Sequence, residues 1–393
     1  MQPPWALVLR AGAALALSMG IGRFAYTPIL PLMHAQAGLS AQSASALATA
    51  NYLGYLIGAL LGIAAPALIC SLPVLRAGQV VLIGTLLLMA ATQNHAIWLA
   101  LRLTAGVTSA LVFMIAVTAM LTWLRARDQH LAGWGFGGVG FGIALSGAVV
   151  LALRATPDWR AAWVSCAALA FILMVVAWPL RPGPATAPTA ARRDGDRPSP
   201  RRWFAALLAS YSLEGVGYII AGTFLVAAIG ENSPAWVGSG AWVLVGLAAL
   251  PAPALWARLG RRWARPTLLL AALLIQAAGI ALPALVHGTG AALLSAVLFG
   301  GTFLGIASLA LALGAHLQYP RAVAVLTTGY STGQILGPLV VTPLLAHGYR
   351  LALLVGAAVV LAAAAAAAVL RIGFPYRVGG MVEPSRAPDR ARV

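Results

Sequence analysis

The sequence predicts an all-α membrane protein with twelve transmembrane helices, arranged as two pseudo-symmetric six-helix bundles. Apolar residues make up 61% of the chain and charged residues only 8%, whereas soluble domains are roughly half apolar and a quarter charged. Uncharged stretches of about 20 residues, enough to cross a hydrocarbon core as a helix, recur along the whole length. A repeat is also visible: SMGIGRFAYTPIL at 18–30 is echoed by LEGVGYIIAGTFL at 213–225.

Each span is predicted to be a helix because backbone groups inside a bilayer must find their hydrogen bonds within the segment, and barrel-type alternation is absent. The first span has Arg10 at its flank and no small-residue cleavage site, so we expect an uncleaved helix and not a signal peptide. The predicted spans are 6–33, 41–70, 73–92, 95–123, 129–153, 160–180, 203–230, 235–257, 265–286, 289–315, 321–346 and 350–371.

Further matches in the same order extend the repeat, and they pair Gly138, Gly142 and Ser146 with Gly329, Gly333 and Gly337, and Pro66-Ala67-Leu68 with Pro253-Ala254-Leu255. We therefore predict an N-terminal six-helix bundle at 1–181 and a C-terminal one at 202–371. Residues 182–201 are rich in Pro, Arg and Ala and cannot bury apolar area, so they are predicted to be a flexible cytoplasmic linker. The tail at 372–393 has a similar composition and is predicted to be a disordered cytoplasmic segment.

The basic residues predict the orientation. All 25 are arginines, and most lie near the N-terminus, in alternate loops or in the tail, whereas the opposite loops hold only Arg154, Arg160 and Arg350. Both termini are therefore expected on the cytoplasmic side by the positive-inside rule. The net charge of +17 is scattered over short loops and not gathered on one soluble face, which argues against nucleic-acid binding.

Several kinds of chemistry are excluded by the sequence. Residues 135–140 match G-x-G-x-x-G but lie inside a predicted membrane helix with no preceding strand, and a Walker motif cannot exist in a chain without lysine. Cys70 and Cys166 lie in apolar helices and have no framework spacing. No metal-ligand spacing occurs among the histidines, which are His34, His95, His130, His287, His316 and His347. We therefore expect no metal, no cofactor and no enzymatic activity.

The chain resembles the major facilitator superfamily over nearly its whole length. The motif Gly20-Ile21-Gly22-Arg23-Phe24-Ala25-Tyr26-Thr27-Pro28, with Gly217-Tyr218 and Thr223-Phe224-Leu225, is similar to the uncharacterised YbfB/YjiJ-type branch. Arg102 and Gly106 match the fourth-helix pattern of the superfamily. Its loop pattern survives only in part at 253–262, where Pro253 and Ala257 replace Gly and Asp. The resemblance implies two halves that rock about a substrate site near the bilayer midplane.

Glycines spaced four residues apart mark faces where helices can pack closely. In the resembled fold, the second, fifth, eighth and eleventh spans meet between the halves, so these glycines are predicted to pack the halves against each other and permit rocking. Static packing is the alternative. The fifth span also carries Gly133 and Gly137. The predicted inter-half glycines are Gly54, Gly58, Gly62, Gly138, Gly142, Gly329, Gly333 and Gly337.

Three charged residues lie deep within predicted spans, well away from the span ends: Arg23, Arg102 and Glu214. Such a group costs about 2.5–3.5 kcal/mol near a helix centre, so it usually faces the bundle interior and marks a pathway. The alternatives are a permanent Arg23–Glu214 pair that latches the halves and, for Arg102, a side chain that snorkels to the membrane surface. Because Glu214 is the only acidic residue in any span, it is predicted to carry a coupling proton.

The predicted substrate or proton pathway comprises Arg23, Tyr26, Thr27, Asn51, Tyr55, Arg102, Tyr211, Glu214, Tyr218 and Gln334. In the first and seventh spans, the polar residues recur at helical spacing, on the same helix face as the charged residue of that span. The repeat also predicts that these two spans lie opposite each other. For Asn51 and Tyr55 of the second span, a structural bridge between helices is as well supported as a role in the pathway. Gln334 is a further candidate in the eleventh span.

These observations predict a secondary active transporter of a small organic solute, coupled to protons, in the bacterial inner membrane. The two arginines would suit an anionic solute. A drug or metabolite efflux antiporter is the alternative within the same class, and a non-transporting membrane receptor or scaffold is the alternative outside it. The expected partners are the small-molecule substrate, protons and the lipid bilayer, with no nucleic acid, and we expect a monomer.

Overall fold

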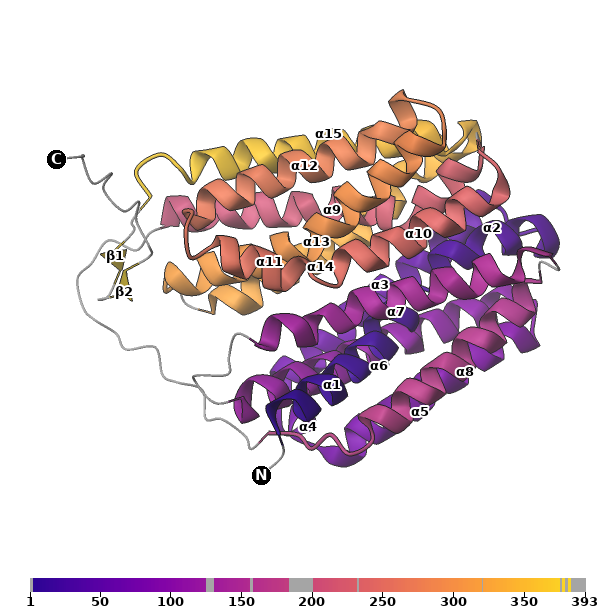
Figure 1. Ribbon diagram of the computed structural model, residues 1–393, viewed down its shortest axis with the longest axis horizontal. Coiled ribbons are helices and arrows are strands. Elements are labelled where there is room, and N and C mark those ends of the chain that lie inside the picture. Colours follow the sequence, from indigo (N-terminus) through magenta and orange to yellow (C-terminus); the bar gives the residue numbers. More distant parts are fainter. Residues whose placement is uncertain are drawn as a thin grey trace.

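The structure is a computed structural model, and it confirms the predicted all-α membrane fold. Two bundles of helices lie side by side, with α1–α8 in one and α9–α15 in the other (Figure 1). We call these the N half and the C half. The structure describes residues 3–124, 131–155, 158–183, 201–231, 233–319, 321–374, 377–378 and 381–382.

The N half contains α1 (Pro4–Leu15), the π-helix η1 (Ala16–Ile21), α2 (Tyr26–Ala37), α3 (Ala41–Ala64), α4 (Pro66–Ile69), α5 (Leu72–Ala91), α6 (His95–Trp123), α7 (Ala132–Ala152), the 3₁₀-helix η3 (Leu153–Ala155) and α8 (Trp159–Ala177). Side-chain oxygens of Ser40, Asn94 and Asp158 accept backbone N–H groups at the starts of α3, α6 and α8, which satisfies donors that a helix start leaves unpaired.

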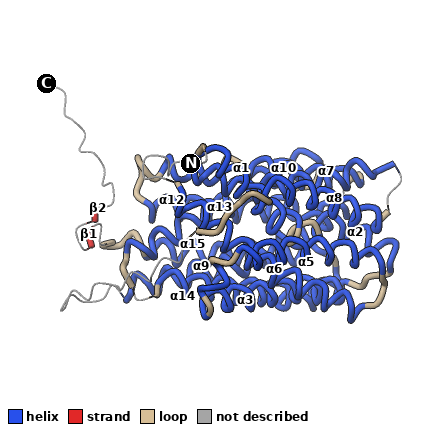
Figure 2. The backbone as a smooth tube through the Cα atoms, turned by 90° about the horizontal axis from the view of Figure 1, so that it is seen from below, coloured by secondary structure: helices blue, strands red, loops and turns tan. Residues whose placement is uncertain are grey.

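The C half contains α9 (Arg201–Glu231), α10 (Ala235–Ala249), α11 (Ala252–Leu259), α12 (Arg265–Leu285), α13 (Thr289–His316), α14 (Ala322–Val341), the 3₁₀-helix η4 (Thr342–His347) and α15 (Tyr349–Val369). The helices of both halves run along one common axis (Figure 2). We call the end where α1 begins and α15 ends the terminal end, and the other the opposite end (Figure 1).

The helices correspond to the twelve predicted spans, although they differ in apolar character. Within the described residues, 10 helices are long and apolar enough to cross a membrane, and α10 with α11 forms one further span bent by 42°. The remaining span, α14, has 20 residues and is less apolar because of the polar run from Thr327 to Gln334. Large apolar side chains such as Leu88, Phe171 and Ile172 remain exposed on the outside, as a bilayer requires.

The first span is not the single continuous helix predicted over 6–33. It passes from α1 through η1 to a turn at 22–25 and resumes as α2. Pro28 contributes to this break, because proline has no N–H to donate to the carbonyl of Phe24 and its ring crowds that carbonyl. The break lies inside the bundle, so the freed carbonyl groups need other donors.

Small residues join the halves along α7 and α10. A Cβ added at Gly137 would press on the backbone of Leu250, and one at Gly133 would lie 2.9 Å from the Cα of Ala254. On α10, a Cβ at Gly246 would meet the backbone of Ala144 and Gly140. The backbone of α7 therefore touches that of α10 and, at Gly133, that of α11, and no larger side chain fits at these glycines.

The eight glycines predicted to pack the halves together pack helices within one half, so that prediction is wrong. Gly54, Gly58 and Gly62 of α3 face α6, and Gly138 and Gly142 of α7 face α1 and η1. In the C half, α14 turns its three predicted glycines, Gly329, Gly333 and Gly337, towards α9. A spacing of four identifies a face that allows close approach, but helix rotation decides which neighbour it meets.

Hydrogen bonds also connect the halves, from the middle of the bundle to the opposite end. Ser45 of α3 donates to the carbonyl of Pro338 at 3.0 Å and lies 2.6 Å from the hydroxyl of Thr342. Thr27 of α2 donates to the carbonyl of Gly222 in α9 at 2.5 Å. The two halves are thus joined by glycine packing on α7 and α10, and by hydrogen bonds on α2, α3, α9 and α14.

The linker and the tail lie largely outside the described residues. Of the predicted linker at 182–201, the structure describes 182–183 and 201. In the predicted disordered tail, it describes residues 372–374 and two short antiparallel strands, β1 (Arg377–Val378) and β2 (Met381–Val382), in which Arg377 pairs with Val382. Among the histidines, His130 also falls outside this part of the chain.

Replacing Gly246 by Ala tests the glycine contact between the halves. The added methyl group would press on the backbone of α7, so we expect a loss of about 1–3 kcal/mol in stability and a lower unfolding temperature in detergent. Gly84→Ala is the matched control, because a Cβ there meets nothing within 4 Å. Equal unfolding temperatures for the two variants would contradict the close packing of α7 and α10.

Candidate functional site

Arg23 is the centre of a buried polar cluster between the halves. It lies in the turn between η1 and α2, and only 2% of its surface is exposed. Its Nη2 donates to Oε1 of Gln334 in the other half at 2.6 Å. The guanidinium carbon lies 4.4 Å from the ring centre of Tyr55, 5.0 Å from that of Tyr52 and 5.4 Å from that of Phe24. Aromatic faces attract such a cation.

No anion accompanies this charge in the structure. Among the described residues, Arg23 has the amide of Gln334 and aromatic rings as neighbours and forms no ion pair. Its Nε is buried and has no hydrogen-bond acceptor in the part of the chain that the structure describes. A buried charge normally carries a partner, because removing it from water is costly. The cluster therefore lacks an acceptor for one buried N–H donor of Arg23 and lacks a negative charge to balance it.

Gln334 connects the two halves at this point. Its Oε1 accepts from Arg23, and its Nε2 donates to the hydroxyl of Tyr218 at 2.7 Å. Arg23 and Tyr218 occupy equivalent positions in the repeat that joins 18–30 to 213–225. Thr27 and Gly222, which hydrogen-bond to each other, are equivalent in the same way. The pseudo-symmetric faces of the first and seventh spans therefore meet at the cluster, as the repeat predicts.

Arg102 has a structural task beside the cluster. Its Nη1 donates to the carbonyl of Gly22 at 3.5 Å and its Nη2 to that of Arg23 at 3.3 Å. Its guanidinium lies 4.8 Å from the ring centre of Tyr26, whose hydroxyl donates to the carbonyl of Ala44. Arg102 is 2% exposed, so it does not snorkel. It supplies donors to the broken helix and thereby fixes the position of Arg23.

Asn51 and Tyr55 have different roles on α3. The side chain of Asn51 donates to the backbone carbonyl of Arg102 at 3.0 Å, which bridges α3 and α6. Gly106, one turn from Arg102, has no space for a Cβ beside the backbone of Asn51. Tyr55 instead places its ring on Arg23. The bridging alternative therefore describes Asn51, while Tyr55 belongs to the cluster.

Glu214 lies fully buried in the C half and does not pair with Arg23. Its Oε1 accepts from Nε2 of Gln276 at 3.2 Å, and its Oε2 has no hydrogen-bond partner among the described residues. The described residues form no Arg23–Glu214 pair, so the predicted latch is not found in this structure. A buried carboxyl group with one amide donor and no cation is poorly compensated as an anion.

A column of stacked rings lies between the two charged groups. Tyr211 stacks on Tyr330 with ring centres 4.3 Å apart, Tyr330 on Tyr218 at 5.5 Å, and Tyr218 on Phe303 at 6.1 Å. Tyr211 and Tyr218 flank Glu214 on one face of α9. The hydroxyl of Tyr218 is also the acceptor for Gln334. The column thus connects the surroundings of Glu214 with those of Arg23.

Sequence reasoning missed several members of the site. Tyr52 stacks on Arg23, and its hydroxyl lies 2.8 Å from that of Thr223 in the other half. Gln276 donates to Glu214, and Tyr330 stacks on Tyr218. A usable signal existed for Gln276, because it is the only amide side chain in the apolar helix α12. Tyr330 and Tyr52 show no such contrast with their sequence neighbours.

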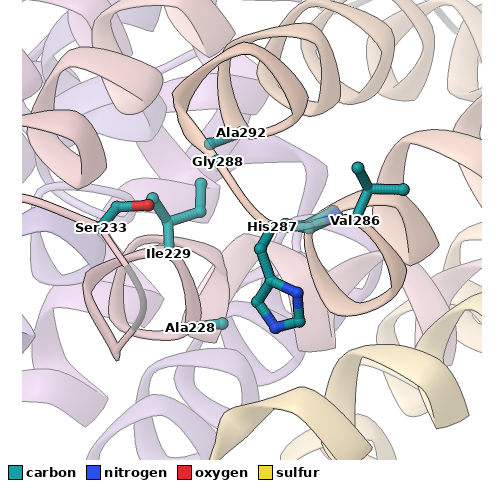
Figure 3. A pocket seen from close by; sticks show the side chains of 8 residues that line it. Ala228, Ile229, Ser233, Val286, His287, Gly288 and Ala292 are labelled. Atoms are coloured by element: carbon teal, nitrogen blue, oxygen red, sulfur yellow. The ribbon is translucent and has the colours of Figure 1, made fainter.

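A pocket elsewhere does not belong to this cluster. It lies at the opposite end of the C half, where α9, α12 and α13 meet, and it is lined by Ala228, Ile229, Ser233, Pro283, Val286, His287, Gly288 and Ala292 (Figure 3). Its walls are mostly apolar, and His287 is its only titratable side chain. Within the part of the chain that the structure describes, no group of three His, Cys, Asp or Glu residues could hold a metal ion.

Comparison with known proteins identifies the class of this chain. The family described as "Uncharacterised MFS-type transporter YbfB" matches residues 15–368. The chain belongs to this family. The structure of a mutant of the nucleoside transporter NupG is similar to this MFS-type transporter, with a TM-score of 0.70 and 15% identity over 93% of this chain and 99% of that chain. At this identity, the similarity shows the fold alone. No curated protein matches the chain.

The family and the fold together identify a multi-pass membrane transporter. In this MFS-type transporter, three buried side chains define the candidate site. Arg23 carries a positive charge with an unused donor, Gln334 links the two halves, and Glu214, apart from the cluster, carries a carboxyl group that can be protonated.

Removing Arg102 tests its support of the broken helix. Arg102→Ala leaves the carbonyls of Gly22 and Arg23 without these donors inside the bundle, so we expect a loss of about 1–3 kcal/mol per unsatisfied group. Thermal unfolding in detergent should show it. Arg350→Ala, at an exposed arginine, is the control and should change little. An Arg102→Ala protein as stable as this control would refute the assigned role.

Proposed function

We propose that this MFS-type transporter is a proton-coupled secondary transporter of a small organic solute. One observation carries the proposal: a cation between the halves and a carboxyl group inside the C half are both buried, and among the described residues neither has an opposite charge beside it. Ionisable groups inside membrane helices are costly and are retained where they serve a pathway. Two separate, uncompensated groups fit a solute site and a proton site.

Glu214 is the proposed proton carrier. It is the only acidic residue in any predicted span, and its Oε2 has no partner. A carboxyl group in these surroundings can take up a proton in one conformation and release it when a cation or water reaches it in another. Tyr211, Tyr218 and Gln276 form the proposed route by which solute binding at Arg23 changes the surroundings of Glu214.

Alternating access is the proposed mechanism. The hydrogen bonds at Ser45, Thr27 and Gln334 join the halves from the middle to the opposite end, and they must break when that end opens. In the contact of α7 with α10, glycines bring the backbones together, and we propose that this surface permits a change of angle. Residues 1–181 would thus rock against 202–371 about the Arg23 cluster.

The distribution of arginines supports a location in the bacterial inner membrane, with the terminal end in the cytoplasm. In this orientation, the end joined by hydrogen bonds faces the periplasm. We propose a monomer whose partners are the solute, protons and the bilayer. An efflux antiporter for drugs or metabolites uses the same parts with the proton moving in the opposite direction to the solute.

A screen of purified protein identifies the solute first. A ligand that binds the folded state raises its stability by mass action, so metabolites, drugs and nucleosides are compared by thermal shift. A stabilising solute is then tested in proteoliposomes with a pH-sensitive dye. Proton movement that depends on the solute supports a transporter, and its direction distinguishes symport from antiport. Binding without proton or solute movement would instead indicate a receptor.

Glu214→Gln tests the proton carrier. The amide cannot exchange a proton, so we expect solute binding and exchange across the membrane to persist while accumulation driven by a pH gradient is lost. Glu231→Gln is the matched control on the same helix, because Glu231 is exposed and accepts from the backbone N–H of Tyr349. Gradient-driven accumulation that survives in Glu214→Gln would show that the proton moves elsewhere.

A further inference from the structure

We propose that Arg23 binds the carboxylate of an organic acid with an apolar body, and that in the present conformation Gln334 occupies part of that anion site. The inference rests on the proposed transport function and names the substrate class. It is drawn from three features of the described residues: the free edge of the guanidinium, the amide that partly covers this edge, and the aromatic walls around it.

On one edge of the Arg23 guanidinium, only one of two neighbouring N–H donors forms a hydrogen bond. Nε–H and Nη2–H point in the same direction from the planar group, and a carboxylate can accept from both with its two oxygens. Here Nη2 donates to a single amide oxygen of Gln334, and the buried Nε has no acceptor. A neutral amide satisfies one of these donors, whereas a carboxylate satisfies both and neutralises the charge.

Gln334 and the acid therefore compete for the same donor. Because Gln334 lies in the C half and Arg23 in the N half, the acid would replace a hydrogen bond that joins the halves. The released amide still has the hydroxyl of Tyr218 as a partner within its own half. Binding of the acid thus removes one inter-half contact at the midplane and lowers the cost of separating the halves.

The aromatic rings around Arg23 indicate the chemical character of the rest of the solute. Besides Tyr52 and Tyr55, the ring of Phe24 borders Arg23, and it lies 6.4 Å from Trp242 and 6.3 Å from Phe303 of the other half. These rings supply apolar area and offer no second cation for a dianion. Arg102 is engaged with backbone carbonyls. The site therefore suits a monocarboxylate with an aliphatic or aromatic body.

The test compares acids with their own amides on purified full-length protein. Benzoate, phenylacetate, indole-3-acetate and hexanoate are each paired with the primary amide of the same shape, and thermal shifts give the relative affinities. We expect at least one acid to bind on the order of tenfold or more tighter than its amide. Arg23→Gln should abolish this preference, whereas Arg350→Gln should retain it. No acid preference in the native protein, or a preference that survives in Arg23→Gln, overturns the proposal.

Two substitutions of Gln334 should act in opposite directions. Gln334→Leu removes the competitor, so acid binding should tighten by roughly tenfold. Gln334→Glu places a permanent carboxylate on Arg23, so it should abolish acid binding and raise the unfolding temperature. The matched control is Gln79→Leu, because Gln79 is fully buried and has no hydrogen-bond partner within the described ranges. Weaker or unchanged acid binding in Gln334→Leu, or unchanged binding in Gln334→Glu, refutes the exchange of Gln334 for the acid.

Reconstitution distinguishes this inference from the proposed function. Acid binding that depends on Arg23, with no movement of the acid in proteoliposomes, keeps the anion site and refutes transport. Proton-coupled movement of an uncharged solute, with no acid preference at Arg23, keeps the transport function and refutes the anion site.

Discussion

The burial of Arg23 without an opposite charge is the constraint on which the centre of this transporter depends. The guanidinium lies between the halves at a break in the first span, where aromatic rings and one amide compensate it only in part. The break itself requires Arg102, whose donors satisfy the carbonyls of Gly22 and Arg23. One arginine thus holds the backbone so that another can offer its charge to the space between the halves.

The two connections between the halves differ in physical character. Along α7 and α10, glycines such as Gly140 and Gly246 bring backbones together, and this contact depends on shape but not on a specific partner. At Ser45, Thr27 and Gln334, the halves share hydrogen bonds, and in the proposed mechanism their donors and acceptors would need new partners when the halves separate. The proposed alternating access would require the first contact to tolerate a change of angle and the second to exist in two states.

The repeat is symmetric in fold but not in chemistry. Arg23 in the first span corresponds to Tyr218 in the seventh, and both contact Gln334. The third span of each half carries one buried glutamine: Gln276 donates to Glu214, whereas Gln79 has no hydrogen-bond partner. The N half therefore supplies the cation and the C half supplies the carboxyl group. In the proposed mechanism, this division would place solute binding in one half and proton exchange in the other.

The sequence by itself determined the class, the spans, the repeat and the buried ionisable residues, because hydropathy and the cost of a charge in a bilayer are properties of each segment alone. Only the tertiary structure decided which groups meet. Gln334, and not Glu214, is the partner of Arg23, and Arg102 serves the backbone of a broken helix. The spacing of eight glycines correctly indicated close helix packing, but the neighbours predicted for them in the other half were wrong. Partners depend on how each helix is rotated about its axis, and in a helix that is apolar on every side the local sequence does not record that rotation.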